Sequence, residues 1–389
     1  MKNTEHTKKE PLFHIVKRDN LSTKKKALFY AGAIFIGLLL GSIICSLFSS
    51  GNPFQFFASL FLGAIGTSRR IWLLLQGTAL LLGVSLALAP AFKMKFWNLG
   101  GNGQILMGCL SYVGVMFYLG GKLPDFLVML LGLIAGVVAG AIWALIPAIF
   151  KAFFGTNESL FTLMMNYIAS GIVATFITIW VKTGSGVLTP IEKGNLPDIA
   201  NKYLLTILVF FLLSAAMYGY LKYSKQGYEI SVVGESNNTA KYIGINVRRV
   251  IIRTMIISGA VAGLVGAFIG GAIDHTVSTT SASNMGFTAI MTAWLAAFNP
   301  LVMIASCLFI TFVSMGMTQV RKDFKFTNDA ISNIVIGIIY FSVIAVTFFL
   351  SYKIVFREGA FDPVKRIFKS VKHIFKRSKK ENAEKEDSV

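Results

Sequence analysis

Long apolar runs separated by short polar segments fill most of the chain, from Ala27 to about residue 351. A bilayer core about 30 Å thick requires about 20 apolar residues for each helix that crosses it. The runs therefore predict about ten membrane-spanning helices, at residues 27–48, 71–92, 104–120, 125–149, 158–181, 203–222, 252–273, 286–298, 300–320 and 330–351. We expect an all-α polytopic membrane protein in which some helices are broken or short.

Two apolar segments are shorter than a full crossing. Residues 286–298 are too few to cross untilted, so this eighth segment is predicted to be a half-helix or to continue into its neighbour. The segment Pro53–Gly66 is also apolar but short, and it predicts a helix that lies on the outer face of the bilayer or dips into it.

The polar segment Gly227–Asn246, GYEISVVGESNNTAKYIGIN, lies between two of the apolar runs. A turn between membrane helices needs only a few residues, whereas this segment is longer, amphipathic and flanked by basic residues. It predicts a cytoplasmic surface that docks another protein. The chain then divides into a basic cytoplasmic N-terminal segment (1–26), a transmembrane domain (27–352) with its cytoplasmic loop (223–250), and a basic amphipathic tail (353–389).

The distribution of basic residues predicts the orientation. With the N-terminus inside, the inner loops and tails hold 28 of the 37 Lys and Arg residues. Cytoplasmic loops carry the excess of Lys and Arg, so both termini and the loop 223–250 are expected to be cytoplasmic. Arg321, Lys322 and Lys325 fall outside in this scheme, against the rule.

Composition supports the membrane class. Hydrophobic residues make up 54% of the 389 residues and charged residues 14%, with a mean hydropathy of +0.66; a soluble domain carries about a quarter charged residues. The net charge of +19 is mostly the inner-leaflet bias of a polytopic protein and does not indicate a nucleic-acid partner. The three cysteines lie in apolar runs without metal or redox spacing, so no metal site is predicted.

The tail carries its own pattern. Asp362 and Pro363 resemble an N-cap and a first helical position, and apolar residues then recur at helical spacing up to Phe375, with Lys and Arg between them. This pattern favours an interfacial helix on anionic lipid. The alternative is a partly disordered basic tail that ends in the polar run 379–389.

The predicted spans contain no Lys or Arg well inside them, and their acidic residues stand at helix ends. Intramembrane ionisable groups mark proton relays and ion sites, so their absence argues against a proton-driven carrier and against a strongly charged solute. No Gly-x-x-x-x-Gly-Lys-Ser/Thr phosphate loop occurs. The energy source is therefore expected on another chain.

Three polar clusters interrupt the apolar pattern. The first, between the second and third spans, supplies Trp97, Asn98, Asn102 and Gln104 among glycines. Irregular backbone at membrane depth is tolerated where it lines a cavity, and carboxamides suit hydroxyls or nucleobase edges. The alternative is a simple inner-face turn.

The second cluster supplies Asn157, Glu158, Asn166 and Tyr167. Capping of the fifth span by Thr156 or Asn157 explains its start. Asn166 lies about two turns further in, where an unpaired amide is costly, so it requires an interhelical partner or a polar solute.

The third cluster brackets the short eighth span with Asn284, Phe287, Trp294 and Asn299. Short, Gly/Pro-interrupted segments in the two halves of a transporter point to its translocation site. The first and third clusters occupy roughly matching places in the two halves.

Taken together, four motifs resemble the permeases of simple-sugar and nucleoside ABC importers. FWNLGGNGQ is similar to that family's F-N-I-G-x-E-G-Q signature, and GTNESLFTLMMNYIA to its T-N-E…M-x-N-Y-I-A stretch. GESNNTAKYIGI resembles its coupling segment G-x-N-x-x-A-A-x-Y-A-G-I, and GFTAIMTAWLAAFNP its G-F-x-x-I-A-V-A-L-L-G…N-P stretch. The T-N-E and N-Y-I-A pair is closer to the nucleoside-type members than to the ribose type.

The sequence departs from the family pattern at several positions. Asn102 replaces the family's Glu, Ser236 replaces the coupling Asn, Thr239 replaces the first of two alanines, and Ala296 replaces a final Gly. These departures bear on solute preference more than on the transporter class.

The resemblance implies a permease subunit of a bacterial ABC importer in the cytoplasmic membrane. Its partners would be an ATPase subunit, a second permease, identical or homologous, an extracytoplasmic binding protein and membrane lipid. ATP and Mg would bind the ATPase, with no cofactor on this chain. The implied path residues are Trp97, Asn98, Asn102, Gln104, Asn157, Glu158, Asn166, Tyr167, Phe287 and Asn299, and the implied coupling residues are Gly234, Glu235, Asn237, Ala240, Tyr242, Gly244 and Ile245.

A neutral nucleoside is the expected solute, with a monosaccharide or a riboflavin-like molecule as alternatives. A secondary transporter or channel would require buried titratable residues or a filter motif. A membrane enzyme would require clustered His, Asp or Glu, whereas the four histidines are scattered at positions 6, 14, 275 and 373.

Overall fold

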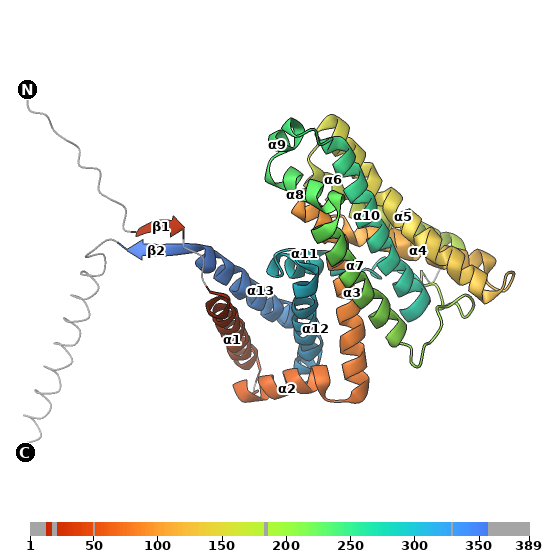
Figure 1. The fold of residues 1–389 in the computed structure, drawn as a ribbon. Helices are drawn as coiled ribbons and strands as arrows, with labels where there is room; N and C mark the ends of the chain where they lie inside the picture. Colours follow the sequence, from red (N-terminus) through yellow and green to blue (C-terminus); the bar gives the residue numbers. More distant parts are fainter. Residues whose placement is uncertain (1–12, 18–21, 50, 183–185, 328–329, 357–389) are drawn as a thin grey trace, which may run out of the picture. The chain divides into compact units, whose positions relative to one another are not determined.

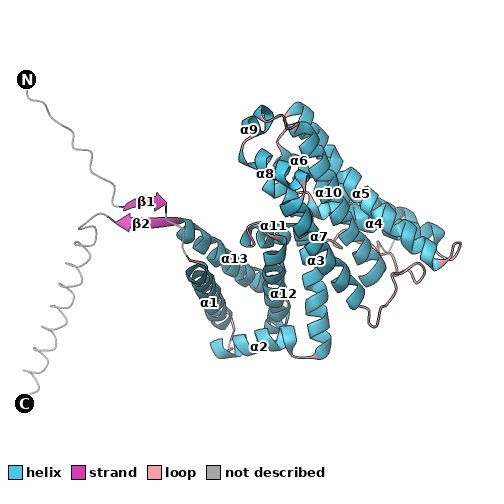
Figure 2. Ribbon diagram, in the orientation of Figure 1, coloured by secondary structure: helices cyan, strands magenta, loops and turns pink. Residues whose placement is uncertain are grey.

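The computed structural model describes residues 13–17, 22–49, 51–182, 186–327 and 330–356. Helices make up most of this part, with one two-stranded ribbon (Figures 1 and 2). In chain order the elements are β1 (Phe13–Lys17), α1 (Thr23–Leu47), α2 (Pro53–Ile65), α3 (Ser68–Lys93), α4 (Gly101–Leu119), α5 (Asp125–Phe154), α6 (Glu158–Trp180), α7 (Leu204–Tyr223), α8 (Lys225–Glu235), α9 (Asn237–Tyr242), α10 (Val247–Phe268), a π-helical turn (Ile269–Ile273), α11 (Met285–Leu295), α12 (Pro300–Asp323), α13 (Ala330–Ser351) and β2 (Tyr352–Phe356).

The chain forms two compact units, one of residues up to Leu40 and from Ile338 onward, the other Gly41–Gly337. In the first unit β1 pairs antiparallel with β2, so that Phe13 lies opposite Phe356. These strands were not predicted; they stand in the segments expected to be a basic N-terminal arm and a basic tail. The predicted amphipathic helix of the tail lies outside the described residues.

The predicted fold class is confirmed. Eight helices among the described residues are long and apolar enough to cross a membrane, and α13 adds a helix of 22 residues. The predicted eighth span is α11, which has 11 residues and therefore extends only about 16 Å. It is a half-helix, as its length indicated, and α2 forms the predicted short helix before α3.

Side-chain caps place the helix ends. Asn157 accepts hydrogen bonds from Ser159 N and Leu160 N and so begins α6, which decides between the two predicted caps. Asn299 accepts from Leu301 N at the start of α12, directly before a proline at the first helical position. Both arrangements satisfy backbone donors that a helix start otherwise leaves open.

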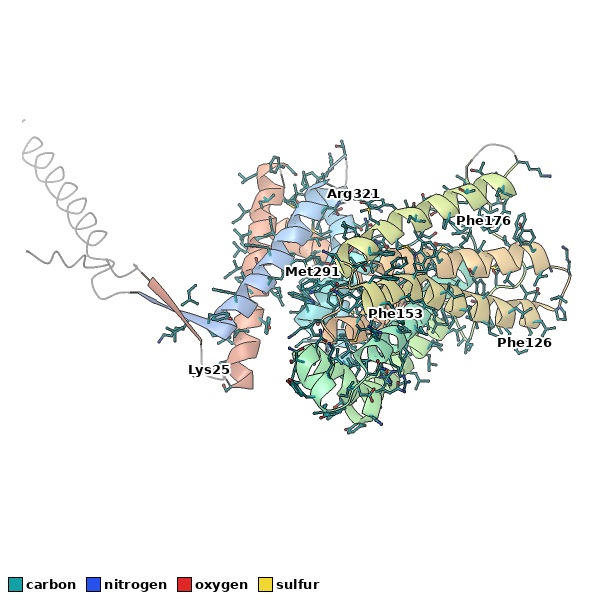
Figure 3. All side chains as sticks on the ribbon, turned by 90° about the horizontal axis from the view of Figure 1, so that it is seen from above. Lys25, Phe126, Phe153, Phe176, Met291 and Arg321 are labelled. Atoms are coloured by element: carbon teal, nitrogen blue, oxygen red, sulfur yellow. The ribbon has the colours of Figure 1, made fainter. Side chains whose placement is uncertain are left out.

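Glycines hold the core of the larger unit together. A Cβ on Gly263 of α10 would collide with the Gly136 carbonyl oxygen of α5, and one on Gly140 would collide with the Gly259 carbonyl oxygen. Glycines four residues apart therefore face each other on α5 and α10, which lets the two backbones touch. Figure 3, a view from above, shows Phe126 and Phe153 at opposite ends of α5.

The larger unit has two distinct ends. At one end α8 and α9 fold over the bundle, and Gly234 of α8 lies against the carbonyl oxygen of Lys93, the last residue of α3 (Figure 1). At the other end lies α2, where Arg70 Nη2 donates to Gln319 Oε1 at 2.7 Å and so joins the start of α3 to the last turns of α12. We call these the α8–α9 end and the α2 end.

Candidate functional site

The break between α3 and α4 builds the first part of the site. A Cβ on Gly101, the first residue of α4, would lie 3.5 Å from a Leu88 methyl group, although α3 continues to Lys93. The chain therefore turns back after α3 and begins α4 about a turn inside the bundle. The free N–H groups of a helix start within the bundle need hydrogen-bond partners.

Asn98 supplies part of that pairing from within the turn. Its side chain is fully buried, and its Oδ1 accepts from Gly100 N at 3.0 Å and from Gln104 Nε2 at 3.2 Å. Its Nδ2 donates to Ser258 Oγ of α10 at 3.2 Å. The Asn98 amide thus fixes the turn, the first turn of α4 and α10 to one another.

Asn166 and Thr162 of α6 add further hydrogen bonds around the start of α4. Asn166 Oδ1 accepts from Gly103 N at 2.7 Å and its Nδ2 donates to Leu99 O at 2.8 Å, while Thr162 Oγ1 accepts from Leu99 N at 3.0 Å. The sequence required an interhelical partner or a polar solute for Asn166. The structure places an interhelical partner there, the backbone around the start of α4.

The first and third polar clusters meet at this point. Asn102 Oδ1 accepts from Gly286 N at 2.8 Å, and a Cβ on Gly286 would lie 2.7 Å from Asn102 N. The start of the half-helix α11 therefore packs directly on the start of α4. Two broken elements from the two halves of the chain are joined by one carboxamide.

A cavity of about 250 Å³ lies beside this contact. Carboxamides, hydroxyls, aromatic rings and aliphatic groups line it, and no lining side chain is one that carries a charge at neutral pH. The lining residues are Asn102, Leu106, Leu163, Asn166, Tyr167, Ser170, Thr279, Thr280, Ala282, Ser283, Asn284 and Phe287. Hydrogen-bonding groups without fixed charge suit a neutral polar solute with a ring that can stack.

Sequence reasoning missed the hydroxyl residues of the segment between α10 and α11. Thr279, Thr280 and Ser283 line the cavity, and the run from Thr276 to Ser283 consists largely of Thr and Ser. That composition was the available signal. The segment is anchored by Thr276 Oγ1, which donates to Leu188 O at 2.7 Å.

An aromatic cluster stands at the α8–α9 end of the site. Trp97 lies 5.5 Å from Trp294 and 5.7 Å from Phe92 between ring centroids, and Phe92 stacks on Phe298 at 6.1 Å. Trp97 and Trp294 are 43% and 48% exposed. Phe287 and Trp294 are seven residues apart, which places them on the same face of α11. This face of α11 therefore leads from the cavity to the aromatic cluster.

Three predicted path residues lie elsewhere. Asn157 and Asn299 cap α6 and α12, and Glu158 pairs with Lys151 at 2.7 Å. Of the others, Asn102, Asn166, Tyr167 and Phe287 line the cavity, whereas Asn98 and Gln104 are buried in the α4 turn. Contact with a solute stays a prediction for all ten.

The buried polar side chains of the described residues are all uncharged. Ion pairs occur at the α8–α9 end, where Arg253 Nη2 lies 3.0 Å from Glu229 Oε2 and ties α10 to α8. Asp274 directly follows the π-helical turn, and burial raises the pKa of its carboxyl.

The predicted coupling residues divide by exposure. Glu235, Asn237, Tyr242 and Gly244 are exposed, Tyr242 to 91%, and Ile245 is half-buried. Gly234 and Ala240 are buried, and Gly234 packs α8 against the end of α3. Tyr242 and the neighbouring Ile243, which is 54% exposed, form a small apolar patch on a polar surface. Such a surface suits a protein partner.

Comparisons with known proteins place the chain in a family. The model of the protein family described as "Branched-chain amino acid transport system / permease component" matches residues 68–344. The nucleoside ABC transporter permease protein NupB of Lactococcus lactis subsp. cremoris is 29% identical over 351 residues, covering 85% of this chain and 92% of NupB. The guanosine ABC transporter permease protein NupP of Bacillus subtilis is 30% identical over 287 residues, covering 71% of this chain and 81% of NupP.

A more distant relative is the probable riboflavin import permease protein RfuC of Treponema pallidum, 25% identical over 272 residues, covering 68% of this chain and 71% of RfuC. The family model spans most of the chain and includes both broken elements, α11 and the α3–α4 turn. The protein is therefore a multi-pass membrane protein that belongs to the branched-chain amino acid transport system permease family, which confirms the family expected from the motifs.

Proposed function

We propose that this chain is the transmembrane permease of an ABC importer and that it moves a neutral nucleoside into the cell. The observation that carries the proposal is the uncharged cavity at the contact of α4 and α11, lined by Asn102, Tyr167 and Phe287. Carboxamide and hydroxyl groups hydrogen-bond to base and ribose, and the aromatic rings stack on the base. The likeness to the nucleoside permease NupB and the guanosine permease NupP supports a nucleoside.

The cavity has no cationic side chain that would pair with a phosphate group. A charge moved into low dielectric without a counter-charge costs at least several kcal/mol. A nucleoside monophosphate would place about two negative charges beside amides, hydroxyls and the partial positive charges of the starts of α4 and α11, with no cationic side chain to pair them. We therefore expect the nucleoside to be taken up and the monophosphate to be rejected.

Energy would come from a separate ATPase that seats on the exposed part of α8 and α9. This chain would bind neither ATP nor Mg, a second permease would complete the path, and a binding protein would deliver the solute. ATP-driven closure of the ATPase pair would move α8 and α9, and Arg253–Glu229 would pass that motion to α10. The permeases would then switch access by rigid-body rocking.

We also propose the cytoplasmic membrane, with the α8–α9 end and both termini inside. Within the larger unit the two ends carry equal numbers of Lys and Arg, nine each. The excess of inner basic residues therefore comes from the terminal segments, eight before Ala27 and eleven from Lys353 onward. Since α12 ends beside the start of α3, Arg321 and Lys322 remain at the α2 end in this orientation.

Uptake in proteoliposomes containing the permease with its ATPase and binding protein tests the solute. Labelled inosine, ribose, riboflavin and inosine monophosphate are compared. Uptake of inosine alone supports the proposal. Uptake of riboflavin favours a riboflavin permease, the second candidate suggested by the likeness to RfuC. Uptake of ribose favours a sugar permease. Preferential uptake of the monophosphate contradicts the neutral-path argument.

Tyr167→Ala tests the cavity itself. The Tyr167 side chain is 69% exposed, so its removal leaves no void in the core, and we expect reduced inosine uptake at unchanged thermal stability. Ile179→Ala is the matched control, because Ile179 lies on the same helix, is 58% exposed and does not line the cavity. Equal uptake by both variants would place the solute elsewhere.

A further inference from the structure

A second cavity lies at the α8–α9 end, away from the one described above. It has a volume of about 280 Å³ and is formed by the last turns of α3 and α7 and the start of α12. Two lysines line it, Lys93 of α3 and Lys222 of α7. Within the described part of the chain, neither lysine forms an ion pair with a carboxylate.

Tyrosines hold the Lys222 ammonium in place. Its Nζ donates to Tyr218 Oη at 2.7 Å and stands 5.0 Å and 5.3 Å from the ring centroids of Tyr218 and Tyr223. These contacts orient the charge but do not neutralise it. The cavity therefore presents two positive charges, and the start of α12 beside them adds the partial positive charge of a helix N-terminus.

The floor of this cavity is apolar. Leu221, Phe298 and Pro300 line it together with the lysines. A free anion gains nothing from such a floor, whereas a ligand that joins a negative charge to an apolar body matches both parts.

The exposed face of α7 leads directly to the cavity. Leu208 and Leu212 are 54% and 68% exposed, and Ala215 is exposed as well. Their spacing of four and then three residues continues to Gly219 and Lys222, so all five stand on one stripe of the helix. An apolar stripe of a membrane helix faces acyl chains, and this one ends at the two lysines.

We propose that this cavity binds the phosphodiester headgroup of an anionic phospholipid from the leaflet at the α8–α9 end. The phosphate would lie between Lys93 and Lys222, and an acyl chain would follow Leu212 and Leu208 along α7. Basic pockets between membrane helices recognise headgroups in this way. The site shares no lining residue with the solute cavity, so it does not depend on which solute is carried.

Its position links lipid to coupling. Lys222 precedes α8 by three residues, and the Lys93 carbonyl oxygen contacts Gly234 of α8. A bound headgroup would hold the base of α8 at the ends of α3 and α7. Anionic lipid is therefore expected to support the coupling surface from the membrane side.

Equilibrium binding of labelled phosphatidylglycerol to the purified full chain in neutral detergent tests the proposal, with phosphatidylcholine as the second lipid. Each lysine near an anionic lipid surface contributes about a fivefold gain in affinity, so Lys93→Gln with Lys222→Gln should weaken phosphatidylglycerol binding about thirtyfold. Tyr218→Phe, which removes only the hydroxyl that orients Lys222, should weaken it by a smaller factor. Lys241→Gln, an exposed lysine of α9, is the control and should bind as the wild type does.

Inorganic phosphate and glycerol 3-phosphate distinguish a lipid from a free anion. The proposal expects neither to displace the lipid at concentrations where unlabelled phosphatidylglycerol does. It is overturned if they compete equally, if the double variant binds like the wild type, or if phosphatidylcholine binds as tightly. It is also overturned if the double variant keeps its lipid but no longer copurifies with the ATPase, because the lysines would then belong to a protein contact.

Discussion

Replacing Asn166 tests whether this residue supports the site or contacts the solute. The Asn166 amide accepts from Gly103 N at 2.7 Å and donates to Leu99 O at 2.8 Å, and the side chain is 9% exposed. Asn166→Leu removes the side-chain partner of both backbone groups. Each such group costs about 1–3 kcal/mol, so the two together destabilise the fold by about 2–6 kcal/mol.

The variant Asn166→Asp is expected to have an intermediate stability. Asn166→Asp, when protonated, keeps the acceptor for Gly103 N and donates its O–H to Leu99 O. Ionisation would remove that donor and leave a charge without a cationic partner, which the surroundings disfavour. We therefore expect the order of stability to be wild type, then Asn166→Asp, then Asn166→Leu.

Thermal unfolding of the detergent-purified chain, followed by size-exclusion chromatography, measures this order. Ile179→Ala is the control, because Ile179 is an exposed residue of the same helix and does not line the cavity. Inosine uptake is measured on the same variants. A loss of uptake in Asn166→Leu at wild-type stability would refute the supporting role and make Asn166 a solute contact; wild-type behaviour in both assays would refute the geometry.

Three further predictions follow from particular contacts. Tyr242→Ala is expected to fold normally, since the side chain is 91% exposed, but to lose solute-stimulated ATP hydrolysis by the partner; Ile199→Ala in the loop before α7 is the control, and full stimulation would remove α9 from the docking surface. Gly263→Leu is expected to prevent folding, because its side chain would collide with the Gly136 carbonyl oxygen, whereas Gly171→Leu, with open space around it, should accumulate as the wild type does; equal yields would refute the α5–α10 contact. The pKa of Asp274 is raised in the folded chain by burial, with His275 opposing, so its stabilising contribution is complete below the ordinary pKa of about 3.8 and is lost as pH rises through the raised value. Asp274→Asn should therefore be at least as stable as the wild type at pH 7, and a variant clearly less stable at that pH would contradict the assignment.

The sequence alone determined the class of the protein, the positions of its apolar helices and its family. Apolar runs of about 20 residues leave few alternatives in a bilayer, and the half-length of α11 followed from counting residues. The motif around Asn98 and Asn102 and the one around Asn166 pointed to the right part of the chain because polar groups at membrane depth need a reason. The exposed α9 followed from the polarity of a loop too long to be a turn.

Only the tertiary structure decided what those polar residues do. Asn98 and Asn166 bond to the backbone around α4, while Tyr167 and Phe287, from helices far apart in the chain, face a common cavity. Which partner a carboxamide finds depends on how deep α4 begins and on which helix lies beside it, and those are long-range contacts that no local pattern encodes. The position of Lys93 and Lys222 at one cavity also depends on long-range contacts. In the sequence they are two ordinary lysines at helix ends, and they form a site only because α3, α7 and α12 bring them together.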